Sequence, residues 1–555
     1  MSSVAIYYHP EAYTTSSPKL MGRNAAGESF LRGLIMHSKL DEYWLQVEKK
    51  EYAQHFAMTA KSLNKNLPLK VVTKNNLITL SQPGVVYYPG PNLGKQAWHR
   101  AAYGHGAWSL CGITHTTSSA NAMDSLVQLI TGPVQAWDAV ICTSQAVKHN
   151  VERLLQAQAD YLVHRLGVQK LVLPLLPVIP LGIHTQDFVF TSAQKASARK
   201  AIKADKNTIV VTFMGRLSFH AKAHPLAMYQ ALEKAAGKLV KGEKQKIVLV
   251  ECGWHANDAI AKAYGNAAQL ACPSVRVAYL DGRNVENRIT AWASADVFCS
   301  LSDNIQETFG IAPIEAMATG IPVVVSNWDG YKDTVRDGID GFLIPTTMPG
   351  PGLGVELALR HALEIDTYDM YCGHTSALIS VDVGATAIAL SKLFESSELR
   401  QRMGSAGQAR AREIYDWSVI IPQYEALWEQ QAEIRMTQQG ALKPLIYPWP
   451  ARMDPFAAFI GYPSQSFTSE TKLNLVDLNY KHAADRLAQY RQLAMVNFAT
   501  LVLPSEDECQ TILAKLSRET TSAADLIKSL PHERQVFIFR ALTWLLKLGI
   551  VKIVI

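Results

Sequence analysis

The stretch ETFGIAPIEAMATGIPVVVS, residues 307–326, sets two carboxylates eight residues apart in an otherwise apolar segment. Pro313 is acceptable only near the start of a helix, so the helix is expected to begin around Gly310. Gly320, with Pro322 close behind, should end it before the strand PVVVS. The segment therefore predicts a loop, a helix and a strand in the order typical of a parallel α/β sheet.

The two glutamates flank the expected helix entrance, where the N–H groups of Phe309, Gly310 and Ile311 would lack partners and would suit a phosphate. The Glu315 carboxylate could accept both hydroxyls of a ribose, and Glu307 could do the same for a second polyol. The alternative is that both acids only favour the helix dipole. The surrounding motifs decide between the two.

Short apolar runs alternate with helical-period segments, a pattern typical of parallel sheets wound with crossover helices. The strands expected in the first part of the chain are VAIYY, GVVYYPG, SLCGITH, DAVICTS and PVIPLGI. Those expected in the second part are TIVVTFMG, KIVLVECG, SVRVAYLD, DVFCSLSD and IPVVVSN. The interface between two such doubly wound domains is a natural ligand site.

We therefore expect an α/β fold with two Rossmann-like domains and additional segments. The first domain would occupy residues 1–185, followed by a polar connector at 186–207 and the second domain at 208–420. A helix that crosses back would occupy residues 421–440, and a mostly helical, winged-helix-like extension would occupy residues 441–555.

Composition restricts the possible classes of protein. The chain has 555 residues and a formal net charge of +6, which is compatible with anionic ligands or a membrane surface and too weak to indicate nucleic acid. Seven cysteines without a CxxC pair argue against a disulfide framework and a zinc site. We expect no signal peptide and no membrane span, and a cytosolic location, with peripheral association at the inner membrane face left open.

Two loops carry further candidate ligands. In TIVVTFMGRLSFHAK, Arg216 and Lys222, the latter expected at a helix start, would place two cations at the carboxyl end of a strand, where a diphosphate is the obvious counter-ion. Solvated loop cations are the alternative. In KLMGRNAAGESF, Glu28 stands where a P-loop needs lysine, which excludes that motif. Gly27 could still let the backbone approach a phosphate at a helix N-terminus, or simply form a tight turn.

Together these motifs resemble a known family. Glu307 to Glu315, with the AMATGIPVVVS that overlaps and follows them, closely resembles the E-x7-E region of retaining glycosyltransferases with the GT-B fold, glycosyltransferase family 4 (group 1) in particular. FMGRLSFHAK resembles the diphosphate motif of the same family. The resemblance covers about residues 1–435 and is strongest over 208–345. It implies two Rossmann-like domains that face a cleft.

The resemblance also implies roles for individual residues. Arg216 and Lys222 would hold the donor diphosphate, Glu315 the ribose and Glu307 the transferred sugar. SLCGITH resembles the segment where phosphatidylinositol mannosyltransferases place an active-site histidine, so His115 is expected at the reacting sugar. The implied catalytic residues are His115, Arg216, Lys222 and Glu307, and the implied donor-binding residues are Gly27, Arg216, Lys222, Asp281, Gly282, Arg283, Phe309, Gly310, Ile311 and Glu315.

The reaction implied is transfer of a sugar from a nucleoside diphosphate sugar, with UDP or GDP, to a hydroxyl of a glycan or lipid-linked acceptor, with retention at the anomeric carbon. Such a reaction would serve the synthesis of polysaccharides, glycolipids or glycoconjugates. No metal and no further cofactor are expected, because two cations and helix amides would neutralise the leaving diphosphate.

Other functions remain open at this point. Nucleotide-sugar epimerases and phosphorylases share the same architecture. The tail TSAADLIKSLPHERQVFIFRALTWLLKLGIVKIVI has two short helices and a strand, which fits a winged helix that binds DNA. Most apolar side chains of its second helix are expected to be buried, and the helix offers few polar residues for a DNA groove. A module for protein contact or self-association is therefore favoured.

Overall fold

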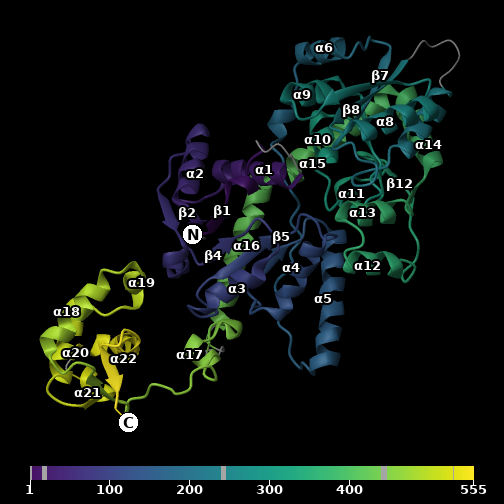
Figure 1. Cartoon of the computed structure of the whole chain (residues 1–555). Helices are drawn as coiled ribbons and strands as arrows, with labels where there is room; N and C mark the ends of the chain where they lie inside the picture. Colours follow the sequence, from purple (N-terminus) through teal and green to yellow (C-terminus); the bar gives the residue numbers. More distant parts are fainter. Residues whose placement is uncertain are drawn as a thin grey trace. The chain divides into compact units, whose positions relative to one another are not determined.

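The computed structural model of the protein describes residues 3–15, 22–238, 246–438, 440, 447–528 and 530–554. By its internal contacts the chain divides into two compact units, Met1–Pro450 and Ala451–Ile555. The first unit contains two parallel sheets surrounded by helices, and the second is mostly helical (Figure 1).

The first sheet has six parallel strands in the order β3-β2-β1-β4-β5-β6, which is the strand order of a Rossmann fold. Its strands are Ala5–Tyr8 (β1), Tyr43–Val47 (β2), Leu69–Val72 (β3), Val85–Tyr87 (β4), Ser109–Ile113 (β5) and Ala139–Ile141 (β6). Its helices are Gly22–His37 (α1), Lys50–Ser62 (α2), Leu93–Ala101 (α3), Ala120–Thr131 (α4) and Gln145–Leu166 (α5).

The second sheet repeats this topology with the order β12-β11-β10-β7-β8-β9, again parallel throughout. Its strands are Thr208–Met214 (β7), Lys246–Gly253 (β8), Arg276–Asp281 (β9), Val297–Ser300 (β10), Val323–Ser326 (β11) and Gly341–Ile344 (β12). The helices around it are Ser192–Ala201 (α6), Leu226–Ala236 (α7), Asp258–Ala271 (α8), Val285–Ser294 (α9), Ile311–Thr319 (α10), Tyr331–Thr334 (α11), Val383–Glu395 (α14) and Ser397–Ile414 (α15).

Central strands such as β7 read as continuous apolar runs because helices cover both faces of each sheet there. β7 is buried along its whole length. Successive side chains of this strand point to opposite faces, so Val210 packs in one core and Val211 in another. Burial on both faces accounts for the run TIVVTFM, which made this strand predictable.

The structure corrects several expectations about the strands. PVIPLGI forms no strand, and its only pairings are isolated bridges from Val178 to Cys142 and from Ile183 to Asp416. Pro177 and Pro180 have no N–H to donate, so a continuous ladder cannot form there. Three strands that the sequence analysis missed complete the sheets: β2, β3 and β12.

The chain passes between the two sheets twice, at neighbouring points. The N–H of Ile183 donates to the carbonyl of Tyr415 at 2.8 Å, and the N–H of Trp417 donates to the carbonyl of Ile183 at 3.1 Å. After the second passage, helix α16 (Trp417–Gln438) packs against α1 and the first sheet. The Trp417 indole N–H donates to the Ser29 hydroxyl at 2.7 Å.

An excursion of the chain, residues 348–379, leaves the second sheet after β12. Its base is closed by a short antiparallel pair, Thr346–Thr347 (β13) with Ser380–Val381 (β14). It contains two helices, Val355–Ala362 (α12) and Tyr368–Ser376 (α13). The Arg360 guanidinium pairs with the Asp366 carboxylate at 2.8 Å, and Asp366 also accepts from His374. These bonds make the excursion a folded element.

The second unit has a core of its own, in which Leu473, Leu513 and Leu542 are almost fully buried. Its three-stranded sheet has the order β16-β15-β17, formed by Lys472–Leu475 (β15), Thr521–Ser522 (β16) and Val551–Ile553 (β17). Its helices are Pro455–Ala458 (α17), Tyr480–Arg491 (α18), Ala494–Asn497 (α19), Glu506–Leu516 (α20), Ala523–Ile527 (α21) and His532–Lys547 (α22). Of the helices in both units that the structure describes, none has the length and apolar character needed to cross a bilayer.

Candidate active site

The site begins at the entrance of α10, where the structure confirms the predicted helix start. Gly310 is the N-cap with φ of +82°, and a Cβ on it would lie 1.9 Å from the Tyr331 ring, so only glycine fits there. Among the described residues, no acceptor is bound by the N–H groups of Gly310 and Ile311. The helix therefore presents two free donors at its positive end.

Lys222 and Glu307 form an ion pair directly in front of this entrance. The Glu307 side chain is 10% exposed and that of Lys222 is 28% exposed. Burial would raise the pKa of Glu307, but the Lys222 ammonium and the N–H groups of Thr308 and Phe309 outweigh it and hold that pKa below its usual range. Glu307 is therefore a carboxylate at neutral pH.

Arg216 lies in the same loop as Lys222. Its Nη2 donates to the Ala221 carbonyl at 2.7 Å and to the Gln306 side chain at 3.0 Å, which orients the guanidinium next to the Glu307 loop. Lys222 lies in a turn before α7 and not at a helix start as predicted, because α7 begins at Leu226 after Pro225. The two predicted cations and Glu307 are thus brought together.

Thr308 joins this cluster to the first sheet. Its hydroxyl donates to the His115 carbonyl at 2.6 Å, and its own carbonyl accepts from the Ser144 hydroxyl at 2.8 Å. His115 follows β5 and Ser144 follows β6, so the carboxyl ends of strands from both sheets meet here. His115 is therefore joined to Glu307 through Thr308, the next residue after Glu307 in the chain.

The His115 ring is held neutral by its surroundings. Burial lowers its pKa to about 4, and the positive charge of Arg23 at the start of α1 acts in the same direction. A neutral imidazole can donate and accept hydrogen bonds at neutral pH.

Glu315 lies in the second turn of α10, on the same helix as the free amides. Dense protein surroundings raise its pKa to about 7, with the positive charge of Arg288 opposing the shift. No hydrogen bond reaches its carboxylate from any residue that the structure describes. Its acceptor capacity is therefore unused.

The loop after β9 carries the remaining predicted residues. Arg283 pairs with Asp281 at 2.7 Å in an exposed ion pair. The Gly282 N–H donates to the Gly253 carbonyl at 2.8 Å. A Cβ on Gly253 would lie 1.9 Å from the Gly215 carbonyl oxygen. Three glycines thus end β7, β8 and β9 in close contact, so the carboxyl edge of the sheet is bare backbone here.

Gly27 does not lie where the sequence predicted. It is inside α1, so its N–H belongs to the helix and is not free at an N-terminus. A Cβ on Gly27 would approach the Ala12 carbonyl oxygen to 2.0 Å. The close packing of α1 on the segment around Ala12 explains why residue 27 is a glycine.

Two residues of the site have no signal in the sequence analysis. Thr308 is one, because its partners lie far away in the chain. Asp329 is the other: it has φ of +44°, and burial together with the Glu307 charge raises its pKa well above the usual range. Its Oδ2 is buried without a hydrogen-bond partner among the described residues. A buried neutral carboxyl group therefore lies beside the ion pair.

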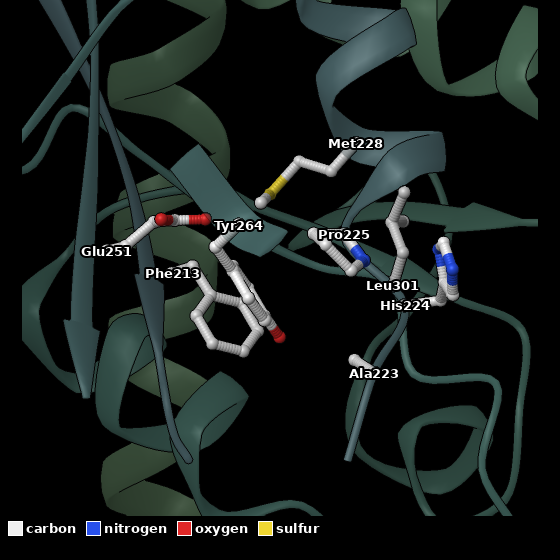
Figure 2. A pocket seen from close by; sticks show the side chains of 8 residues that line it. All are labelled: Phe213, Ala223, His224, Pro225, Met228, Glu251, Tyr264 and Leu301. Atoms are coloured by element: carbon white, nitrogen blue, oxygen red, sulfur yellow. The ribbon is translucent and has the colours of Figure 1, made fainter. Parts of the chain in front are cut away.

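A small cavity of about 10 Å³ lies behind the loop that carries Lys222 (Figure 2). Phe213, Met228 and Tyr264 line it, with Glu251 at one side. Tyr229 donates a 2.6 Å hydrogen bond to Glu251, and burial raises the pKa of Glu251 to about 7. The cavity has room for about one water molecule, so it is too small to hold a substrate.

Metal ligands do not gather in this part of the molecule. Within the ranges that the structure describes, no group of three or more His, Cys, Asp and Glu side chains is placed to bind a metal ion.

Residues 194–349 match the family model described as Glycosyl transferases group 1. That range contains Arg216, Lys222, Glu307 and Glu315. A phosphatidyl-myo-inositol mannosyltransferase of Mycobacterium tuberculosis is 30% identical over 173 residues, which cover 30% of this chain and 37% of that protein. A D-inositol 3-phosphate glycosyltransferase of Mycolicibacterium vanbaalenii is 30% identical over 177 residues, covering 30% and 36%. The match thus spans little more than a third of each relative.

The solved structure of Alr3699/HepE from Anabaena, in complex with UDP, covers 77% of this chain and 100% of that chain. The TM-score is 0.50 and the sequence identity is 16%, so the likeness concerns the fold alone. With the two Rossmann-type sheets, it confirms the predicted GT-B fold class. The chain therefore has a GT-B fold, and its residues 194–349 match glycosyl transferases group 1.

Proposed function

We propose that this protein is a retaining glycosyltransferase of family 4, which moves a sugar from a nucleoside diphosphate sugar to a hydroxyl acceptor. The main support for this proposal is the Lys222–Glu307 ion pair at the N-terminus of α10, which Thr308 joins to the His115 loop. It combines cations, free helix amides and a carboxylate at one point, as a sugar diphosphate requires.

Different residues of the site bind the diphosphate, the ribose and the base of the nucleoside diphosphate sugar. Arg216, Lys222 and the N–H groups of Gly310 and Ile311 bind the diphosphate, with Phe309 as the buried residue that precedes them. Glu315 accepts the ribose hydroxyls with its unused carboxylate. The backbone of Asp281, Gly282 and Arg283 faces the base. Gly27 is not needed as a donor ligand, since its N–H lies within a helix.

In the proposed reaction the acceptor oxygen forms a bond to the anomeric carbon on the face from which the diphosphate leaves. The bond between that carbon and the phosphate oxygen breaks, and the acceptor proton passes to the leaving phosphate. Arg216, Lys222 and the α10 amides stabilise the charge of the diphosphate, which is the main electrostatic contribution. Glu307 and the neutral His115 hold hydroxyls of the transferred sugar. No metal ion and no further cofactor take part.

The donor and acceptor classes follow from chemistry and from similar proteins. UDP in the Anabaena structure supports a UDP-sugar, and the name of the mycobacterial mannosyltransferase supports a hydroxyl on an inositol lipid or glycan. We propose a UDP- or GDP-sugar as donor and a glycan or lipid-linked hydroxyl as acceptor, in cytoplasmic synthesis of glycolipid, polysaccharide or glycoconjugate. Sedimentation with liposomes would measure peripheral membrane association.

A thermal-shift series with UDP-, GDP- and ADP-glucose tests the donor assignment, because a ligand that binds the folded state raises the unfolding midpoint. Proton NMR of the products then reads the anomeric configuration. A donor that is isomerised without an acceptor would identify an epimerase instead. No midpoint shift with any of the nucleotide sugars would argue against the proposal.

The second unit is proposed as a module for self-association. Several of its large apolar side chains are exposed, among them Phe456 at 70%, Tyr462 at 83%, Phe498 at 80% and Leu501 at 88%. The exposure of these side chains supports the proposal, because exposed apolar surface is typical of sites of protein contact. Light scattering of the full chain would measure its mass in solution. Salt-dependent DNA binding would favour the winged-helix alternative.

A further inference from the structure

The excursion 348–379 contacts both loops that meet at the site. The Tyr368 hydroxyl lies 3.2 Å from the Thr116 hydroxyl and 3.2 Å from the Ser118 hydroxyl, both in the loop that carries His115. Further along α13, a Cβ on Gly373 would lie 3.1 Å from the Cβ of His220, in the loop that carries Lys222. One helix therefore packs against the His115 loop and the Lys222 loop.

The His115 loop is held at two points by residues of the second sheet and its excursion. Thr308 binds the His115 carbonyl, and Tyr368 binds the hydroxyls of Thr116 and Ser118. Ser118 and Thr116 also bond each other at 3.1 Å, so three hydroxyls form one small network. Ser118 is 5% exposed, whereas Thr116 and Tyr368 are half-buried, so competing water is excluded mainly at Ser118.

The geometry of α13 fixes where the Tyr368 hydroxyl lies. Thr367 caps the helix by accepting the N–H of Met370, so Tyr368 is the first helical residue and faces the neighbouring loop. At its base the excursion is tied to the second sheet by the β13–β14 pair. The hydroxyl is thus carried on a helix braced from both ends.

We propose that Tyr368 is a positioning residue, which places the His115 loop relative to the Lys222–Glu307 pair. The inference rests on the proposed function for its catalytic consequence. The hydrogen bonds themselves stand without it. A ring without its hydroxyl keeps the packing and loses the fixation, so the loop should open more often while the nucleotide site stays intact.

The test compares Tyr368→Phe with Tyr371→Phe in the full chain. Tyr371 is in the same helix and stacks on His361, and its hydroxyl makes no hydrogen bond to a residue that the structure describes. Hydrogen exchange by mass spectrometry should show at least about 10-fold faster exchange of residues 115–119 in Tyr368→Phe, since loss of one bond of ~1.4 kcal/mol is a tenfold change. Tyr371→Phe should exchange as the wild type does.

The kinetic arm measures release of nucleoside diphosphate from UDP-, GDP- or ADP-glucose, whichever the wild type uses. Tyr368→Phe should lower kcat by about 10- to 100-fold, as expected for a misplaced reacting group, with UDP and GDP affinity unchanged by calorimetry. Ser118→Ala added to Tyr368→Phe should cost less than the sum of the two single effects, because both remove the bond between Ser118 and Tyr368.

Wild-type exchange rates in Tyr368→Phe would overturn the proposal, and so would faster exchange with unchanged kcat. If the wild type binds and turns over no nucleotide sugar, the proposed function fails. The exchange arm still decides whether Tyr368 fixes the His115 loop.

Discussion

Thr308 donates a 2.6 Å hydrogen bond to the carbonyl oxygen of His115, which lies 193 positions earlier in the chain. Its own carbonyl accepts from Ser144, so one residue links a loop of the second sheet to two loops of the first. Thr308 is also the immediate neighbour of Glu307. The relation between the Glu307 carboxylate and His115 is therefore set by a residue outside the glutamate pair.

Thr308→Val should keep the shape of the side chain and remove the bond to His115. We expect kcat to fall by up to about 100-fold, the effect of a small displacement at the reacting centre. Nucleotide affinity should stay near that of the wild type. Thr319→Val is the matched control, since Thr319 is equally buried and donates to Ala316 within α10. Equal losses in both variants would contradict this role.

Lys222→Ala should lower kcat by about 100- to 1000-fold, the usual cost of removing one preorganised charge contact. It also leaves the Glu307 carboxylate without its cation. Initial rates with the selected nucleotide sugar measure the effect. Lys246→Ala is the control, because Lys246 pairs with Asp205 at the exposed surface. Near-normal turnover would remove Lys222 from the site.

Glu307→Ala should abolish most turnover, by at least about 100-fold, while UDP and GDP still bind, because Glu307 is assigned to the sugar and not to the nucleotide. Calorimetry with the free nucleoside diphosphate separates the two effects. A loss of affinity that matches the loss of turnover would place Glu307 at the nucleotide instead.

Glu315→Gln should weaken binding of the nucleoside diphosphate sugar and flatten its pH dependence. The pKa of Glu315 is raised to about 7, so its carboxyl group loses its proton as the pH rises from 6 to 8. Ribose hydroxyls donate to the ionised form, so wild-type affinity should increase over that range, by up to about 10-fold. Calorimetry at pH 6 and 8 measures it. An affinity that is the same in both proteins at pH 8 would refute the ribose contact.

Glu251→Gln should stabilise the protein at high pH. Burial raises the pKa of Glu251 to about 7 in the folded state, whereas the unfolded state loses this proton near its ordinary value. Between these values the unfolded state binds fewer protons, so folding stability falls as the pH rises and the cost is complete above about 7. Glutamine has no charge and should recover up to about 3 kcal/mol.

Thermal unfolding at pH 5 and 8 checks this expectation. The midpoint of Glu251→Gln should exceed that of the wild type at pH 8 and approach it at pH 5. Glu429→Gln, at an exposed position of α16, should show the wild-type pH dependence. The idea is refuted if Glu251→Gln shows that dependence as well.

The sequence predicted what local chemistry dictates. Gly310, Pro313 and Gly320 act on their own stretch of backbone, and the helix begins and ends where they indicate. The apolar run of β7 is visible because both faces of that strand are covered. Gly27 was assigned to the wrong environment, because a glycine permits close approach equally in a turn and inside a packed helix.

What could not be predicted depends on contacts between distant residues. Tyr368 and Thr116 are 252 positions apart, and neither belongs to a motif. β2 was missed because Trp44 and Gln46 share the strand with smaller apolar residues and break a uniform pattern. The raised pKa of Asp329 can be recognised only once Glu307 is placed beside it, and so can the buried Oδ2 of its carboxyl group.

The two passages of the chain between the sheets, at Ile183 and at Tyr415–Trp417, are hydrogen-bonded to each other. Thr185 adds a 2.6 Å bond from its hydroxyl to Asp416 at the same place. Because the two covalent connections between the sheets are bonded to each other at one place, they act as a single pivot. Such a pivot permits rotation of one sheet against the other and resists sliding. A rotation of one sheet against the other about this point would have to break the bonds that join their loops, among them those of Thr308 and Tyr368 and the 2.7 Å bond from the Gln145 N–H to the Asp333 carboxylate.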